Sequence, residues 1–98
     1  MTFPVHIRPI TYWVSAVPET VVDAHHFGLT VRYRGNNTWC VKNTFDLYLD
    51  ANGEAEVEHR LSFEEAMERA TGLVPHTVVN GYTVADALAF PDGPPPRT

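Results

Sequence analysis

Cys40 is the residue of this chain whose type and neighbours come closest to covalent chemistry. It is the only cysteine, so no disulfide can form within the chain. In the hairpin predicted below, Arg32 lies across from Cys40 and Lys42 follows two residues later, and such cations lower the pKa of a thiol. A nucleophile also needs a positioned base, and no pattern brings His26 near it. We therefore favour an unreactive thiol, with a small thiol-dependent enzyme using Cys40 as the alternative.

The five histidines lack the spacing of a metal site. His25 and His26 are adjacent, and neighbours in a strand point to opposite faces of a sheet. The sequence contains no Cys-x-x-Cys pair, no glycine-rich phosphate loop and no nucleophile elbow. Paired carboxylates need a cleft that desolvates one of them, which a flat hairpin face does not offer. The sequence therefore predicts no metal, no cofactor, no catalytic residue and no enzymatic activity.

Acidic residues gather in one stretch of the chain, and they are the predicted partner-binding residues. In the register described below, one outward hairpin face carries Tyr48 surrounded by Asp46, Asp50, Glu54, Glu56 and Glu58. Like charges opposite one another on a sheet are destabilising, so a compensating group is expected. The compensation is either a bound protein or a set of ion pairs with the basic residues of the neighbouring hairpin, Arg32, Arg34 and Lys42.

The composition of the chain excludes several classes of partner. Its net charge of −5 has the wrong sign for neutralising phosphates, so we expect no nucleic acid. No segment has the apolar length of a membrane span, and the first residues lack the basic and apolar regions of a signal peptide. A 98-residue chain without a disulfide suits a reducing compartment, so we expect it in the cytoplasm.

Two hairpins are predicted by asking which loop length keeps apolar residues on a common face. A three-residue loop at 35–37 gives the pairs Arg34–Thr38, Tyr33–Trp39, Arg32–Cys40 and Val31–Val41, with Asn37 in the left-handed region. A three-residue loop at 51–53 gives the pairs Asp50–Glu54, Leu49–Ala55, Tyr48–Glu56, Leu47–Val57 and Asp46–Glu58. Alternation runs unbroken from residue 38 to 50, which predicts one long strand, kinked near residues 43 and 44, that serves both hairpins.

Two helices are predicted from capping boxes, in which the first residue and one three positions later satisfy each other's backbone. Ser62 with Glu65 starts an amphipathic helix that ends at Gly72, and its buried stripe is Phe63, Ala66, Met67 and Ala70. Thr83 with Asp86 starts a short second helix. A strand is expected over 11–17 and another over 76–79, where Asn80-Gly81 could also close a tight hairpin.

These elements predict an α+β fold in which helix and sheet form two layers. We expect an antiparallel sheet of four to five strands, one amphipathic helix packed on one face and a short C-terminal helix. Residues 1–90 form a single domain, and residues 91–98 form a disordered proline-rich tail. The strand over 11–17, if it is an unpaired edge, offers a further alternative, a self-associating structural protein that forms a homo-oligomer.

Five short segments carry a resemblance to a known group of proteins, namely 31–35 (VRYRG), 39–41 (WCV), 50–54 (DANGE), 59–66 (HRLSFEEA) and 78–81 (VVNG). In their order and spacing, over about residues 27–88, the chain resembles small uncharacterised proteins of actinobacteria and their (myco)bacteriophages. The resemblance implies no catalytic residues. It implies a small phage-encoded accessory protein that binds a host or phage protein in the host cytoplasm. The candidate binding surfaces are the acidic hairpin face and the exposed side of the helix that starts at Ser62.

Overall fold

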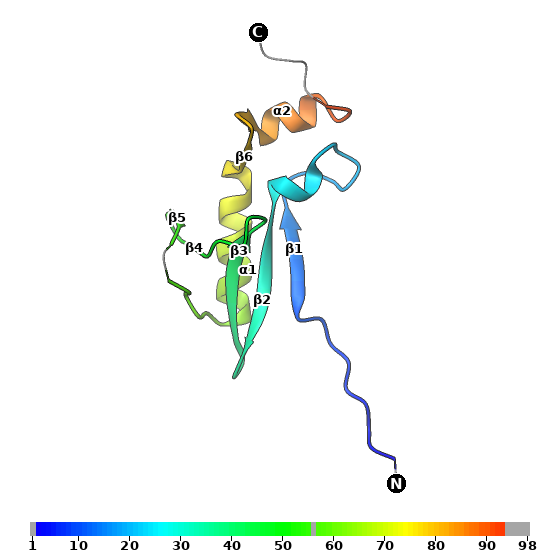
Figure 1. Cartoon of the computed structure of the whole chain (residues 1–98), viewed down its shortest axis with the longest axis vertical. Coiled ribbons are helices and arrows are strands. Elements are labelled where there is room, and N and C mark those ends of the chain that lie inside the picture. The colour runs from blue at the N-terminus through cyan, green and yellow to red at the C-terminus, as the bar shows by residue number, and fades with distance from the viewer. Residues whose placement is uncertain (1, 56, 94–98) are drawn as a thin grey trace.

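The computed structural model describes residues 2–55 and 57–93, and it confirms the predicted α+β class (Figure 1). The strands are β1 (Thr11–Ser15), β2 (Gly28–Gly35), β3 (Thr38–Asn43), β4 (Leu49–Asp50), β5 (Gly53–Glu54), β6 (Val78–Val79) and β7 (Tyr82–Thr83). The α-helices are α1 (Phe63–Leu73) and α2 (Val84–Ala89), and the 3-10 helices are η1 (Ala24–Phe27) and η2 (Val74–His76). Within the described residues no helix is long and apolar enough to cross a membrane.

The main sheet contains three antiparallel strands in the order β1-β2-β3, and α1 packs across one of its faces (Figure 1). The predicted size of four to five strands is wrong, because β4 with β5 and β6 with β7 form two separate pairs. Each of these four strands is only two residues long. These two short hairpins lie beside the main sheet and are not hydrogen-bonded into it as further strands.

The larger core lies between the sheet and α1. Its buried members are Leu29, Val31, Trp39, Val41, Leu49, Ala66, Ala70 and Val74. Both alanines of α1 are fully buried, because small side chains let the helix lie close against the sheet. Tyr12, Trp39 and Phe63 extend this core as three mutually contacting rings, with centroids 5.0 to 5.9 Å apart.

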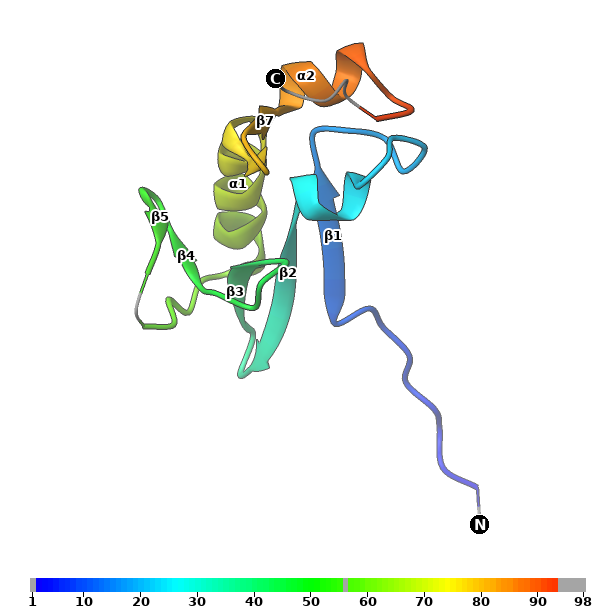
Figure 2. The same cartoon turned by 45° about the horizontal axis from the view of Figure 1, so that its top comes forward.

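A smaller core lies at one end of the molecule, where α2 meets the segment between β1 and β2 (Figure 2). Its buried members are Val17, Val21, Ala24, Phe27 and Ala87. The predicted short C-terminal helix is therefore present as α2, and its one buried alanine anchors it to this cluster.

The β2–β3 hairpin has the predicted pairs Tyr33–Trp39, Arg32–Cys40 and Val31–Val41. Its loop is tighter than predicted, because Gly35 pairs with Thr38 and Arg34 is left as a bulge. Asn36 and Asn37 have φ angles of 51° and 58°, a left-handed conformation that asparagine tolerates and that two-residue hairpin turns require. The left-handed position predicted for Asn37 is thus confirmed.

The predicted long strand from β3 into β4 is wrong, because the chain reverses at Asn43. The Asn43 N–H donates to the carbonyl of Leu47 at 2.9 Å. Its side-chain oxygen accepts from the N–H groups of Phe45 at 2.9 Å and Leu47 at 3.0 Å. This side-chain hydrogen bonding replaces the strand ladder with a turn, and it brings Tyr48 back alongside Lys42 as an antiparallel bridge.

The β4–β5 hairpin also differs from the predicted register. Leu49 pairs with Glu54 and Asp50 pairs with Gly53, so its loop has two residues where three are predicted. The predicted pairs Asp50–Glu54 and Leu49–Ala55 are therefore wrong. A slip of one residue moves a side chain to the other face of a hairpin, and Glu54 stands opposite Leu49 instead of Asp50.

Both predicted capping boxes are present. The Ser62 hydroxyl accepts from the Glu65 N–H at 3.1 Å, and the Glu65 carboxylate accepts from the Ser62 N–H at 3.2 Å. Thr83 and Asp86 form the same reciprocal pair at the start of α2. α1 ends one residue after the predicted stop and continues directly into η2.

The remaining strands are shorter than predicted. β1 ends at Ser15, and the strand predicted over 76–79 is reduced to its last two residues, which form a hairpin with β7. The turn between β6 and β7 places Asn80 and Gly81 at φ angles of 52° and 81°. Residues 94–98 of the predicted disordered tail lie outside the described residues.

Candidate functional site

The predicted acidic residues Asp46 and Glu58 are paired with cations of the first hairpin. The Asp46 carboxylate lies 2.7 Å from the Lys42 ammonium and 3.2 Å from the Arg32 guanidinium. Hydrogen bonding to Lys42 lowers the pKa of the Asp46 carboxyl, with its charge and that of Arg32 adding to the effect. The Glu58 carboxylate forms an ion pair with Arg34. Of the two compensations considered for these charges, ion pairing accounts for this part of the acidic stretch.

The other predicted binding residues are dispersed by the turn at 43–47 and the register of β4–β5. Tyr48 lies under the ammonium of Lys42, which is 4.7 Å from the centre of its ring. The Asp50 carboxylate accepts from the N–H of Asn52 at 2.7 Å and stays within its own loop. Glu56 lies outside the described residues. Asp46, Tyr48 and Glu54 do share the border of one open hollow of about 520 Å³.

Cys40 does not have the environment of a reactive thiol. It is completely buried on the sheet face opposite α1. Burial raises the pKa of the thiol, and the charge of Glu58 raises it further. The neighbouring cations, including Arg32 and Lys42, lower the pKa by less. The expectation of a lowered pKa is therefore wrong, because burial and a carboxylate outweigh the basic neighbours.

The two adjacent histidines lie in η1 and not in a strand, so their rings do not point to opposite faces. The ring centroids of His25 and His26 are 3.8 Å apart. His26 also stacks on Phe45, with centroids 6.0 Å apart and planes inclined by 14°, and its Nδ1 lies 3.5 Å from the Thr44 hydroxyl. Among the residues that the structure describes, no group of three or more metal-ligating side chains occurs.

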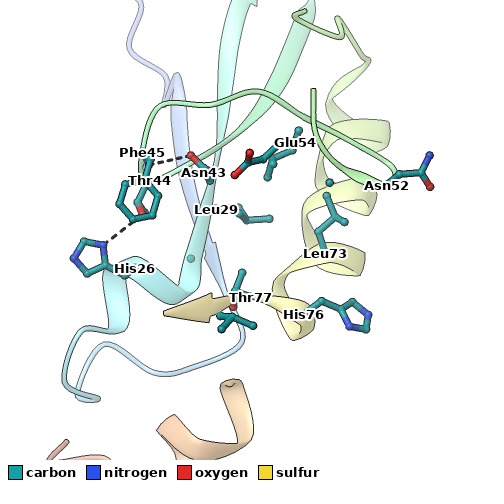
Figure 3. A pocket seen from close by; sticks show the side chains of 14 residues that line it. His26, Leu29, Asn43, Thr44, Phe45, Asn52, Glu54, Leu73, His76 and Thr77 are labelled. Carbon is teal, nitrogen blue, oxygen red and sulfur yellow. Dashed lines mark hydrogen bonds between the residues drawn. The ribbon is translucent and has the colours of Figure 1, made fainter. Parts of the chain in front are cut away.

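A groove of about 360 Å³ opens between the β4–β5 hairpin, the 43–45 turn and the carboxyl end of α1 (Figure 3). Leu29 and Leu49 form its floor and are only 3% and 7% exposed. The stacked rings of His26 and Phe45 stand on one side, and Leu73 of α1 stands on the other (Figure 3). A concave site with an apolar floor and a few polar groups is the usual form of a binding pocket.

Glu54 supplies the negative charge of this groove. Figure 3 shows its carboxylate pointing across the groove toward Asn43 and Leu29, whereas Asn52 and His76 point away. Within the described part of the chain, no lysine or arginine lines the groove, and Glu54 takes part in no ion pair. The slip in the β4–β5 register therefore places a carboxylate beside apolar side chains and without a cation.

Glu54 borders the hollow together with Asp46 and Tyr48, as predicted for the acidic face, and it also lines the groove, which the sequence does not predict. The lining of the groove comes from η1, β2, the 43–45 turn, β4–β5 and residues 73–78. The only local signal was the pair Asn43 and Asp46, two residue types that favour turns. Comparison of the chain with protein families, with curated proteins and with solved structures finds no match.

Proposed function

We propose that this chain is a small non-enzymatic binding protein whose groove holds an arginine side chain of a host or phage protein. The observation that carries the proposal is the Glu54 carboxylate, which faces a groove with an apolar floor and has no ion-pair partner among the described residues. The net charge of −5 favours approach of a basic segment in the same way.

The lining of the groove matches both parts of an arginine side chain. The aliphatic stem has the chemistry to cover Leu29 and Leu49, since long basic side chains bury their methylene groups on apolar surfaces. The planar guanidinium can stack on the Phe45 ring and donate two hydrogen bonds to the Glu54 carboxylate. Lysine offers a point charge and no plane, so the site favours arginine over lysine.

The resemblance to phage and actinobacterial proteins supports an accessory role, in which a small protein acts by holding another protein. We propose the setting that the resemblance implies, the host cytoplasm, and a binding role that needs no cofactor. The alternative role, a thiol-dependent enzyme, is less well supported, because Cys40 is buried and the pKa of its thiol is raised.

A matched set of short peptides tests the proposal. The probes are blocked Gly-Leu-X-Leu-Gly peptides in which X is arginine, lysine, citrulline or leucine, and binding is followed by NMR of the isotopically labelled full chain. We expect the arginine peptide to bind most tightly and to shift the amides of residues 43–54. Citrulline has the shape of arginine without its charge, so equal binding of the two peptides would refute the proposal, as would the absence of any binding.

The Glu54→Gln variant tests the assigned carboxylate. We expect arginine-peptide affinity to fall about 3- to 10-fold, because a solvent-accessible charged contact contributes roughly 1 kcal/mol. Glu64→Gln is the matched control, since Glu64 lies exposed on α1 and does not border the groove. An equal loss in both variants would indicate a general effect of net charge and no specific site.

Two further variants separate the groove from the hollow on the other side of the hairpin. Val78 lines the groove and is 59% exposed, whereas Leu47 lines the hollow and is 44% exposed. We expect Val78→Ser to weaken binding and Leu47→Ser to leave it unchanged. The reverse result would move the site to the surface that Asp46, Tyr48 and Glu54 share.

A further inference from the structure

The first residues of the chain form an extended arm, residues 2–9, that leaves the body of the molecule at the start of β1 (Figure 1). Three of its apolar side chains, Phe3, Val5 and Ile7, are 78%, 82% and 91% exposed. They are spaced two residues apart, so in an extended chain they lie on one side. The arm thus has the side-chain pattern of a half-buried strand but no sheet to pair with.

The outer edge of β1 is a strand edge without a partner in the described chain. β1 pairs with β2 on one side only. The Tyr33 N–H donates to the carbonyl of Ile10, so the alternation of an antiparallel ladder directs the backbone groups of Thr11 and Trp13 outward. β1 contains no charged residue and no proline, which are the usual means of protecting an edge from pairing.

We propose that this chain forms a two-fold dimer in which the arm of each copy pairs, antiparallel, with the free β1 edge of the other copy. Each chain supplies both an unpaired arm and an unprotected β1 edge. In a two-fold dimer each arm pairs with the β1 edge of the other copy, so neither arm and neither edge is left unpaired. The root of the arm is held toward β2, because the Arg8 guanidinium lies 4.3 Å from the centre of the Tyr33 ring and Ile10 bonds to Tyr33. In both views the arm continues beyond the start of β1 and does not turn back along the outer edge of its own strand (Figures 1 and 2).

The sequence of the arm determines on which face of the partner's main sheet its apolar side chains lie. Pro4 and Pro9 have no N–H, so within residues 3–7 the side of the arm with a complete set of donors is that of Phe3, Val5 and Ile7, and this side lacks a donor only at Pro9, at the root of the arm. Residues that exchange hydrogen bonds in an antiparallel pair stand opposite each other with their side chains on the same face. The apolar stripe therefore lies beside Trp13, on the face away from α1.

Trp13 provides the surface that this stripe would cover. It remains 38% exposed, and its indole lies directly over Gly28 of β2, where any larger residue would collide with the ring. A flat aromatic surface beside an unpaired edge is suited to strand addition, in which backbone hydrogen bonds hold the strand and alternate side chains fill adjacent sites.

Sedimentation velocity of the full chain tests the dimer. We expect the mass of a dimer for the natural sequence and the mass of a monomer for a Val5→Asp, Ile7→Asp double variant. His6→Asp is the matched control, because His6 lies on the other side of the arm, and it should remain a dimer. These arm residues are exposed, so circular dichroism should show an unchanged fold. A monomeric natural chain, or a dimer that survives the double variant, would overturn the proposal.

Crosslinking distinguishes exchange between copies from an arm that folds back on its own strand. An Ile7→Cys variant and a differently tagged Thr11→Cys variant are mixed and treated with a short bifunctional maleimide; Cys40 is buried and does not compete. We expect a mixed crosslinked dimer. If a chain carrying both cysteines instead yields only a crosslinked monomer, the arm pairs within its own chain and the proposal is wrong.

Discussion

The two hairpins of this protein have similar loop sequences but are held in different ways. β2 and β3 are eight and six residues long, and alternate residues of both strands lie in the core under α1. β4 and β5 have two residues each, and Leu49 is their only side chain in that core. The first hairpin is fixed by packing along its length, whereas the second is fixed at one point and by its turns.

This difference explains why the same pairing argument gives the correct register for Val31–Tyr33 with Trp39–Val41, although the predicted three-residue loop and the pair Arg34–Thr38 are wrong, and gives the wrong register throughout β4–β5. In β2–β3, a slip of one residue would move every buried side chain to the opposite face, so burial determines the register. In β4–β5 such a slip costs little, because Leu49 keeps its place and its neighbours are exposed or half-buried. Where burial does not determine the register of a hairpin, the conformation of its turn does. In β4–β5 the two-residue turn sets the register and places Glu54 beside the groove.

Removing a buried methyl pair from the first hairpin should have the largest effect on stability. Val31 is fully buried in β2, so Val31→Ala loses transfer free energy and leaves a cavity, at a cost of about 2–3 kcal/mol in the free energy of unfolding. The measurement is chemical denaturation followed by circular dichroism. Val57→Ala makes the same chemical change after the second hairpin, where Val57 is 65% exposed, and should stay within about 0.5 kcal/mol. Equal costs at the two positions would contradict the comparison.

Truncating the single anchor of the second hairpin should act locally. Leu49→Ala is expected to cost about 1–2 kcal/mol, less than a central core truncation, because β4–β5 can detach while β2–β3 stays folded. Hydrogen exchange should then accelerate at the Ala55 N–H, which donates to Tyr48 at 2.9 Å, and remain slow in β3. Leu47→Ala is the control, since Leu47 is 44% exposed. Faster exchange throughout the sheet would show that both hairpins unfold as one unit.

The features that the sequence predicts correctly are those encoded within a few neighbouring residues or by dense burial. Ser62 and Thr83 start helices because their side chains and the acidic residues three positions later satisfy one another locally. The register of β2–β3 follows from alternation that burial enforces. The number of strands in the sheet was overestimated, because apolar alternation alone does not reveal that the chain reverses at Asn43.

The groove could not be predicted, because its parts come together only in three dimensions. The turn at Asn43 depends on one side-chain oxygen that accepts two backbone N–H groups, and an alternating pattern gives no warning of it. That turn exposes Phe45 and positions its ring against His26. The charge of Glu54 predicts that it is a binding residue. Its position in the groove depends on the two-residue loop of β4–β5, which pairs Glu54 with Leu49.

The smallest effect on stability is expected for the ion pair that links the two hairpin regions, between Arg34 of β2 and Glu58 after β5. Glu58→Gln removes the ion pair with Arg34, which is partly exposed, and should change stability by less than about 1 kcal/mol. Because the Glu58 charge raises the pKa of the Cys40 thiol, its removal should lower that pKa, and a pH titration of the Cys40 Cβ chemical shift by NMR measures the change without a reagent having to reach the buried thiol. Glu64→Gln, remote on α1, should leave this titration unchanged. An unchanged Cys40 titration in the Glu58→Gln variant would show that the Glu58 charge does not act on the thiol.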